Sequence, residues 1–192
     1  MQQSLLDNAI RFAVAAHSGA RRKGRNIPYI LHPLEAAAIV SSMTEDLEVI
    51  AAAVLHDVLE DTDAAEDDLL KAFGARVTRL VRAESEDKRS GSDPRDTWLA
   101  RKREAIDALK NETDIAVKMI MLGDKLSNMR AFREGRRLEG DRLWDRFNQK
   151  DPKMQAWYYS SIADATSELK DFTAWQEYLR LVREVFGDSS LT

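Results

Sequence analysis

The sequence predicts an all-α protein: one helical-bundle domain over residues 1–192, with a metal site near its centre. Apolar residues recur at helical spacing along most of the chain, and no segment alternates convincingly as a strand would. The content of 8 glycines and 4 prolines leaves room for long helices. A chain of 192 residues can bury a sizeable core as one domain, and no repeat or linker marks a second one.

The elements follow from periodicity and from helix start and stop signals. The first helix is expected over residues 4–17, followed by a loop rich in glycine and arginine as far as Leu31. Pro33 suits a first helical turn, which places His32 at the N-cap boundary of the second helix. Gly74 separates two helices, and the polar residues 85–96 are expected to form the most mobile loop. Helices are expected over 33–43, 46–61, 65–73, 75–84, 97–110, 112–132, 140–148, 152–169 and 173–186.

Composition excludes several functional classes. The chain has no cysteine, which removes thiolate metal sites and disulfides and is compatible with the cytoplasm, the expected location. No apolar stretch is long enough to span a bilayer, and the N-terminus shows no signal-peptide pattern. The net charge of -4 argues against nucleic acid as a bulk partner. The oligomeric state stays open.

The run 55–62, with the sequence LHDVLEDT, is the strongest functional signal. His56 and Asp57 are adjacent, and Glu60 and Asp61 follow four residues after each of them, so one helix would carry all four on neighbouring parts of its surface. Acidic residues at a helix end usually lie in water. Here residues 49–55 are almost entirely apolar and predict a buried helix, whose charges need a partner. A divalent cation beside spare carboxylates can generate a hydroxide nucleophile, so we predict a metal-dependent phosphohydrolase.

Only two other histidines are present. His32 precedes an apolar helix and is free to point inward, whereas His17 closes the first helix, where a structural role near the negative end of the helix dipole is the better interpretation. Asp124 ends a second apolar run and shares a helix face with Asn128, four residues later. A solvated face with an ion pair would explain Asp124 alone. Together with His32 and His56–Asp57 it completes the order His, His-Asp, Asp.

Five segments in this order resemble the HD-domain superfamily, and within it the hydrolase domain of the RelA/SpoT family in its stand-alone form, the small alarmone hydrolases. They are residues 12–23, 28–33, 53–62, 86–88 and 123–130. Each segment alone is weak, but the set is specific and covers roughly the first 130 residues, while the final third matches loosely. The resemblance implies an HD-type helical bundle without the synthetase or regulatory domains of the long family members.

The resemblance also implies roles for individual residues. The family's activity is removal of pyrophosphate from the 3′ position of guanosine tetra- and pentaphosphate (ppGpp and pppGpp), usually with Mn²⁺. Its metal ligands correspond to His32, His56, Asp57 and Asp124, and its catalytic carboxylates to Glu60 and Asp61. Its substrate-binding residues resemble Arg22, Lys23, Tyr29 and Asn128, with Lys153 matched further along the chain.

Two departures leave the exact nucleotide open. Residues 23–28 replace the family's more usual acidic turn, and Glu84-Ser85 stands where threonine is more common. An adenine alarmone is therefore an alternative substrate, and a deoxynucleotide is another. A cyclic dinucleotide is disfavoured, because the Gly-Tyr-Pro element of the HD enzymes that act on such substrates is absent near the site. A non-catalytic nucleotide-binding module is the other alternative.

Basic residues gather in two clusters. One comprises Arg21, Arg22, Lys23 and Arg25, and the other Arg130, Arg133, Arg136 and Arg137. A solvated face is the ordinary explanation of each cluster. The first also fits a positive lip that attracts a phosphate-rich molecule. The role of the second stays open.

Overall fold

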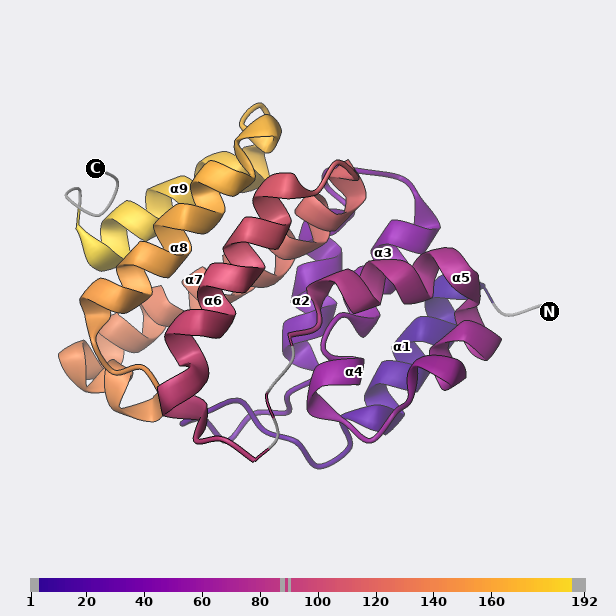
Figure 1. The fold of residues 1–192 in the computed structure, drawn as a ribbon, viewed down its shortest axis with the longest axis horizontal. Coiled ribbons are helices and arrows are strands. Elements are labelled where there is room, and N and C mark those ends of the chain that lie inside the picture. The colour runs from indigo at the N-terminus through magenta and orange to yellow at the C-terminus, as the bar shows by residue number, and fades with distance from the viewer. Residues whose placement is uncertain (1–3, 87–88, 90, 188–192) are drawn as a thin grey trace.

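The computed structural model describes residues 4–86, 89 and 91–187, and these ranges are helical apart from loops and one isolated bridge between Arg21 and Pro28 (Figure 1). The α-helices are α1 (Leu5–Ala16), α2 (Leu31–Val40), α3 (Leu47–Leu55), α4 (Val58–Asp61), α5 (Glu66–Glu84), α6 (Pro94–Asn111), α7 (Ile115–Glu139), α8 (Pro152–Ala165) and α9 (Thr173–Phe186). Two 3-10 helices, η1 (Gly140–Arg146) and η2 (Ser167–Leu169), follow α7 and α8. The predicted all-α class is confirmed.

Helices α2 and α7 join two groups of helices. In Figure 1, α1, α3, α4 and α5 lie on one side, and α6, α8 and α9 lie on the other. Helix α2 packs on both α3 and α7, while α7 also contacts α9 and α5. One apolar core runs through both groups, from Ala9 in α1 to Val185 in α9. No helix in the described part of the chain has the length and apolar character needed to cross a membrane.

A glycine permits a close approach between α2 and α7. A Cβ atom on Gly123 would lie 2.7 Å from Cγ2 of Val40 and 2.9 Å from the carbonyl oxygen of Ala36. Both distances are too short for real atoms, so only glycine fits at this crossing. Asp124 follows directly, and His32 lies in the first turn of α2, so the crossing brings these two residues toward each other.

Several helix boundaries differ from the predicted ones. Helix α2 begins at Leu31 and not at Pro33, which places His32 inside the first turn. Helix α6 begins at Pro94, because Asp93 accepts a 2.9 Å hydrogen bond from the amide of Arg95 and caps it. The predicted loop over 85–96 is therefore shorter, and residues 87, 88 and 90 lie outside the described residues.

Elements in the middle and at the end of the chain agree with the predicted ones in part. Helix α7 continues to Glu139, past the predicted end at residue 132. Gly74 interrupts α5 with a φ of 82°, which confirms the predicted separation there. Helix α9 spans Thr173–Phe186, as predicted, whereas the helix predicted over 152–169 is divided into α8 and η2.

Candidate metal centre and active site

The His56–Asp57 pair lies at a break between α3 and α4, so the prediction of one continuous helix over 46–61 is wrong. Nδ1 of His56 donates to the carbonyl oxygen of Ala53 at 2.8 Å. A continuing helix would offer that same carbonyl to the amide of Asp57, so the side chain competes with the backbone. The four polar side chains of this run therefore project from a turn and a short helix, not from one regular surface.

His32 reaches the same region from α2. Its Nδ1 lies 2.8 Å from Oγ of Ser127, which donates to a carboxylate oxygen of Glu35 at 2.7 Å. Since the carboxylate only accepts, the serine hydrogen points to Glu35 and Nδ1 of His32 must donate to the serine. Both His32 and His56 therefore use Nδ1 for a hydrogen bond and direct Nε2 at the centre.

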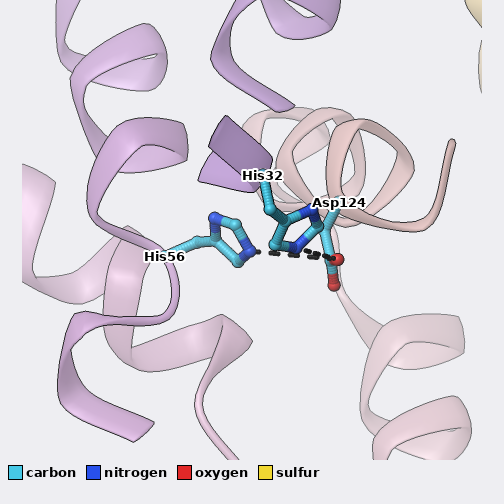
Figure 2. A group of neighbouring side chains, drawn as sticks. All are labelled: His32, His56 and Asp124. Carbon is cyan, nitrogen blue, oxygen red and sulfur yellow. Dashed lines mark ion pairs between the residues drawn. The ribbon is translucent and has the colours of Figure 1, made fainter. Parts of the chain in front are cut away.

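Asp124 completes the cluster from α7. Its Oδ1 lies 3.1 Å from Nε2 of His32 and 3.9 Å from Nε2 of His56. Figure 2 shows the three side chains pointing at one another from separate elements. Their ligand atoms lie within 4.8 Å of one another, and all three residues are buried. Asn128 donates to Oδ1 of Asp124 at 2.6 Å, and Lys125 pairs with its other oxygen.

Asp57 borders this group. Its Oδ2 lies 3.0 Å from Nε2 of His56 and 3.5 Å from Nε2 of His32. Burial lowers the pKa of His56, but the nearby carboxylates of Asp57 and Asp124 raise it by more, so the pKa of His56 is about 10. Burial also favours protonation of Asp57, yet the His56 imidazole holds the pKa of that carboxyl below its usual range.

The donor set fits a divalent cation. Two imidazole nitrogens and carboxylate oxygens converge on one buried point, and the carboxylates favour positive charge there. Mixed nitrogen and oxygen ligands suit first-row transition ions. Hydrogen bonds from His56 to Ala53 and from His32 to Ser127 orient the rings, as partners of metal-binding histidines commonly do. This buried group is a candidate divalent-metal site.

The acidic pair lies beside the cluster. Glu60 and Asp61 both line the cavity that contains the candidate metal site. The hydroxyl of Tyr29 donates to Oδ2 of Asp57 at 2.7 Å and lies 3.2 Å from Oδ2 of Asp61. Burial and these carboxylates raise the pKa of Tyr29, so its hydroxyl stays protonated. No sequence pattern indicated this connection.

The cavity has a volume of about 770 Å³ and a basic side. Arg22, Lys23 and Arg25 line it from the loop before α2, and Arg146 lines it from η1. Arg22 donates to Oδ1 of Asn128 at 2.9 Å, so two predicted substrate-binding residues contact each other. The first basic cluster therefore borders the candidate site through all of its residues except Arg21.

Other predicted residues lie elsewhere. Lys153 is exposed and is not among the residues that line the cavity. In the second basic cluster, Arg130 binds Glu177 and Glu35, and Arg137 binds Glu134, which accounts for these charges by ion pairing.

His17 is buried against Tyr29, with ring centroids 5.0 Å apart. Burial lowers the pKa of His17, so the positive charge expected at this helix end does not develop. Its Nε2 has no hydrogen-bond partner among the described residues. His17 thus lies one side chain away from the acidic pair, closer to the site than its position at a helix end suggested.

Sequence reasoning missed several cavity residues. Lys102 lies 4.8 Å from the ring centre of Tyr158 and donates to Glu86 at 2.5 Å. The Tyr158 hydroxyl and Oε1 of Glu84 are buried without hydrogen-bond partners among the described residues. Burial raises the pKa of Glu84 to about 8, although Lys125 opposes that shift. Of these residues, Glu84 had a sequence signal as a departure from the resembled family, and Glu86 had one as part of the matching segment 86–88.

Comparisons with known proteins agree with this geometry. A family model described as HD domain matches residues 9–149. The guanosine-3′,5′-bis(diphosphate) 3′-pyrophosphohydrolase MESH1 of Danio rerio is 38% identical over 130 residues, which are 66% of this chain and 68% of that protein. The bifunctional (p)ppGpp synthase/hydrolase SpoT of Escherichia coli (strain K12) is 39% identical over 126 residues, which are 65% of this chain and only 18% of SpoT.

A guanosine-3′,5′-bis(diphosphate) 3′-pyrophosphohydrolase of Vibrio cholerae is 40% identical over 116 residues, which are 60% of this chain and 16% of that protein. The chain therefore spans less than a fifth of the length of these two bacterial relatives. Among solved structures, a metazoan ortholog of SpoT that hydrolyses ppGpp superposes with a TM-score of 0.76 and 25% identity, covering 100% of this chain and 99% of that one. The protein lmo0812 from Listeria monocytogenes EGD-e gives a TM-score of 0.70 and 28% identity, with 81% and 98% covered. The matched family model spans the candidate metal site and most of the residues that line its cavity, and the chain belongs to the HD domain family.

Proposed function

We propose that this protein is a manganese-dependent phosphohydrolase that removes pyrophosphate from the 3′ position of ppGpp and pppGpp. The observation that carries the proposal is the convergence of His32, His56 and Asp124, with Asp57 beside them, in a cavity that also holds an acidic pair and a basic side. The names of MESH1 and SpoT, and the ppGpp-hydrolysing structural neighbour, support the choice of substrate.

The four residues His32, His56, Asp57 and Asp124 would hold the ion. When bound, a divalent ion would acidify a coordinated water and polarise the 3′-diphosphate. In the reaction the water oxygen forms a bond to the phosphorus nearest the ribose. The bond from that phosphorus to the 3′ oxygen breaks, and the 3′ oxygen takes up the proton that the water has released, leaving a 3′-hydroxyl and free pyrophosphate.

The chain's own groups supply the proton transfer and the binding. Glu60 and Asp61 would orient the water and accept its proton, because both line the cavity beside the proposed ligands. Arg22 and Lys23 would neutralise phosphate charge, and Asn128, held by Arg22, would bond the ribose or a phosphate. Lys153 has no place in this proposal because it lies outside the cavity wall.

The proposed location is the cytoplasm, because the substrate is a small nucleotide. The direct test incubates purified protein with ppGpp, pppGpp and their adenine counterparts, with and without Mn²⁺, and analyses the products. Release of pyrophosphate from the guanine compounds, dependent on Mn²⁺, is the expected result. Hydrolysis of the adenine compounds alone would identify an adenine alarmone hydrolase, and binding without turnover would indicate a nucleotide-binding module.

A further inference from the structure

Tyr29 occupies a position that its sequence motif did not predict. The family resemblance implied only that Tyr29 binds the substrate. In the structure the Tyr29 hydroxyl donates to Oδ2 of Asp57 at 2.7 Å and lies 3.2 Å from Oδ2 of Asp61. One phenol therefore connects a proposed metal ligand to a proposed water-activating carboxylate.

Neighbouring side chains hold the ring in this orientation. The His17 ring lies with its centroid 5.0 Å from that of Tyr29, and the His32 ring lies at 5.8 Å in an edge-on arrangement. The Arg22 guanidinium lies 5.7 Å from the ring centre. The Tyr29 backbone amide is also fixed, by a 2.9 Å hydrogen bond to the carbonyl of Ala20. A ring packed in this way is suited to aim its hydroxyl.

The oxygen that accepts from Tyr29 is the one that faces the metal cluster. Oδ2 of Asp57 lies 3.0 Å from Nε2 of His56 and 3.5 Å from Nε2 of His32. The hydrogen bond from Tyr29 therefore determines how this carboxylate is rotated toward the centre. Oδ2 of Asp61 lies at hydrogen-bond distance from the same Tyr29 hydroxyl.

We propose that Tyr29 is a positioning residue: its hydroxyl orients Asp57 by donating to it and lies within hydrogen-bond distance of Asp61, with His17 packed against its ring. The proposal rests on the proposed function, because it assigns Asp57 to the metal and Asp61 to the water. Partners that orient metal ligands are typically worth about 10- to 100-fold in metal affinity or activity.

The test compares Tyr29→Phe, which keeps the ring and removes the hydroxyl, with Tyr29→Leu, which removes both. If the hydroxyl orients Asp57, Tyr29→Phe should lower kcat about 10- to 100-fold with KM unchanged. Its Mn²⁺ affinity, measured calorimetrically without nucleotide, should also fall by about 10-fold or more. Tyr29→Leu should lower kcat by at least as much. If the ring instead borders the base, Tyr29→Phe should match the parent while Tyr29→Leu raises KM, and that result would overturn the proposal.

A matched control separates this effect from general loss of stability. Tyr178 is fully buried, and its hydroxyl donates to the carbonyl of Tyr159 at 2.8 Å. Tyr178→Phe should lower Tm and leave kcat unchanged. If the parent hydrolyses none of the nucleotides, the proposed function fails, and Mn²⁺ affinity alone then decides: about a 10-fold or greater loss in Tyr29→Phe supports the link to Asp57, and an unchanged value contradicts it.

Discussion

Ser127 accepts a hydrogen bond from Nδ1 of His32 across 2.8 Å, and thereby leaves Nε2 of that ring as the nitrogen that faces Asp124. Ser127→Ala should remove the acceptor that fixes the ring and reduce Mn²⁺ affinity by about 10- to 100-fold. Titration calorimetry measures this directly. Ser160→Ala is the matched control, because Ser160 is a buried serine whose hydroxyl has no partner among the described residues. Equal affinities in both variants would mean that Ser127 does not orient the ring.

Removing a proposed ligand should have a larger effect. Asp57→Ala should abolish Mn²⁺ binding and nucleotide hydrolysis together, since it removes the carboxylate 3.0 Å from Nε2 of His56. Calorimetry and a product assay on the same preparation check this. Asp63→Ala, an exposed acid nearby in the sequence, should leave both unchanged. Undiminished Mn²⁺ affinity in Asp57→Ala would show that the ligand is assigned wrongly.

The acidic pair should affect the chemical step and not metal binding. Glu60→Gln keeps the size of the side chain and removes its basicity, so kcat should fall by roughly 10²- to 10⁴-fold, the range of general acid–base groups. Metal affinity and KM should stay near the parent values. Loss of the metal from this variant would instead place Glu60 among the ligands.

The basic side of the cavity should act through phosphate charge. Arg22→Ala and Lys23→Ala should each lower kcat/KM for ppGpp by about 10- to 100-fold, the equivalent of about 1.5–3 kcal/mol per charge-assisted contact. A salt titration of kcat/KM should shrink the difference from the parent, because added ions screen the attraction. Arg137→Ala is the control, since Arg137 pairs with Glu134 outside this cavity. Identical salt profiles for all four proteins would identify the loop as solvated surface.

The pH dependence of stability should reveal the raised pKa of Glu84. Its pKa is raised by burial from the ordinary 4.5 to about 8, so between these values the folded protein holds a proton that the unfolded chain has lost. The contribution of the protonated Glu84 to the free energy of unfolding is therefore fully present below about pH 4.5 and is lost as the pH rises to about 8. In denaturant titrations with a chelator present, the unfolding free energy of the parent relative to Glu84→Gln should fall across this window. A difference independent of pH, or the same trend in the exposed Glu45→Gln, would contradict the assignment.

Helical periodicity was enough to predict the all-α class, and the helix-breaking glycine at position 74 was enough to predict the separation there, because each depends on local sequence. The break after Leu55 was not predictable in this way, because periodicity continues through it and only the bond from His56 to Ala53 reveals the competition. The start of α6 was missed for a different reason: Asp93-Pro94 is a capping signal inside a segment whose polarity suggested a loop.

The candidate site likewise has a part that the sequence predicted and a part that it did not. Motif order located His32, His56 and Asp124, which the structure brings together from three elements. Residue identity could not show where Tyr29 directs its hydroxyl, or that Lys102 approaches Tyr158 from another helix. Such contacts depend on packing between segments far apart in the chain, and a one-dimensional pattern carries no distance between them.

The tight crossing at Gly123 has a consequence for how members of such a family diverge. A sequence that kept every histidine and aspartate of the centre but carried alanine at this position would still match the motif. Its two crossing helices would have to move apart, because the added atom would meet Cγ2 of Val40 and the carbonyl oxygen of Ala36 at 2.7 and 2.9 Å. The separation would be transmitted to the span between His32 and Asp124, so loss of activity could begin at a residue that never touches substrate.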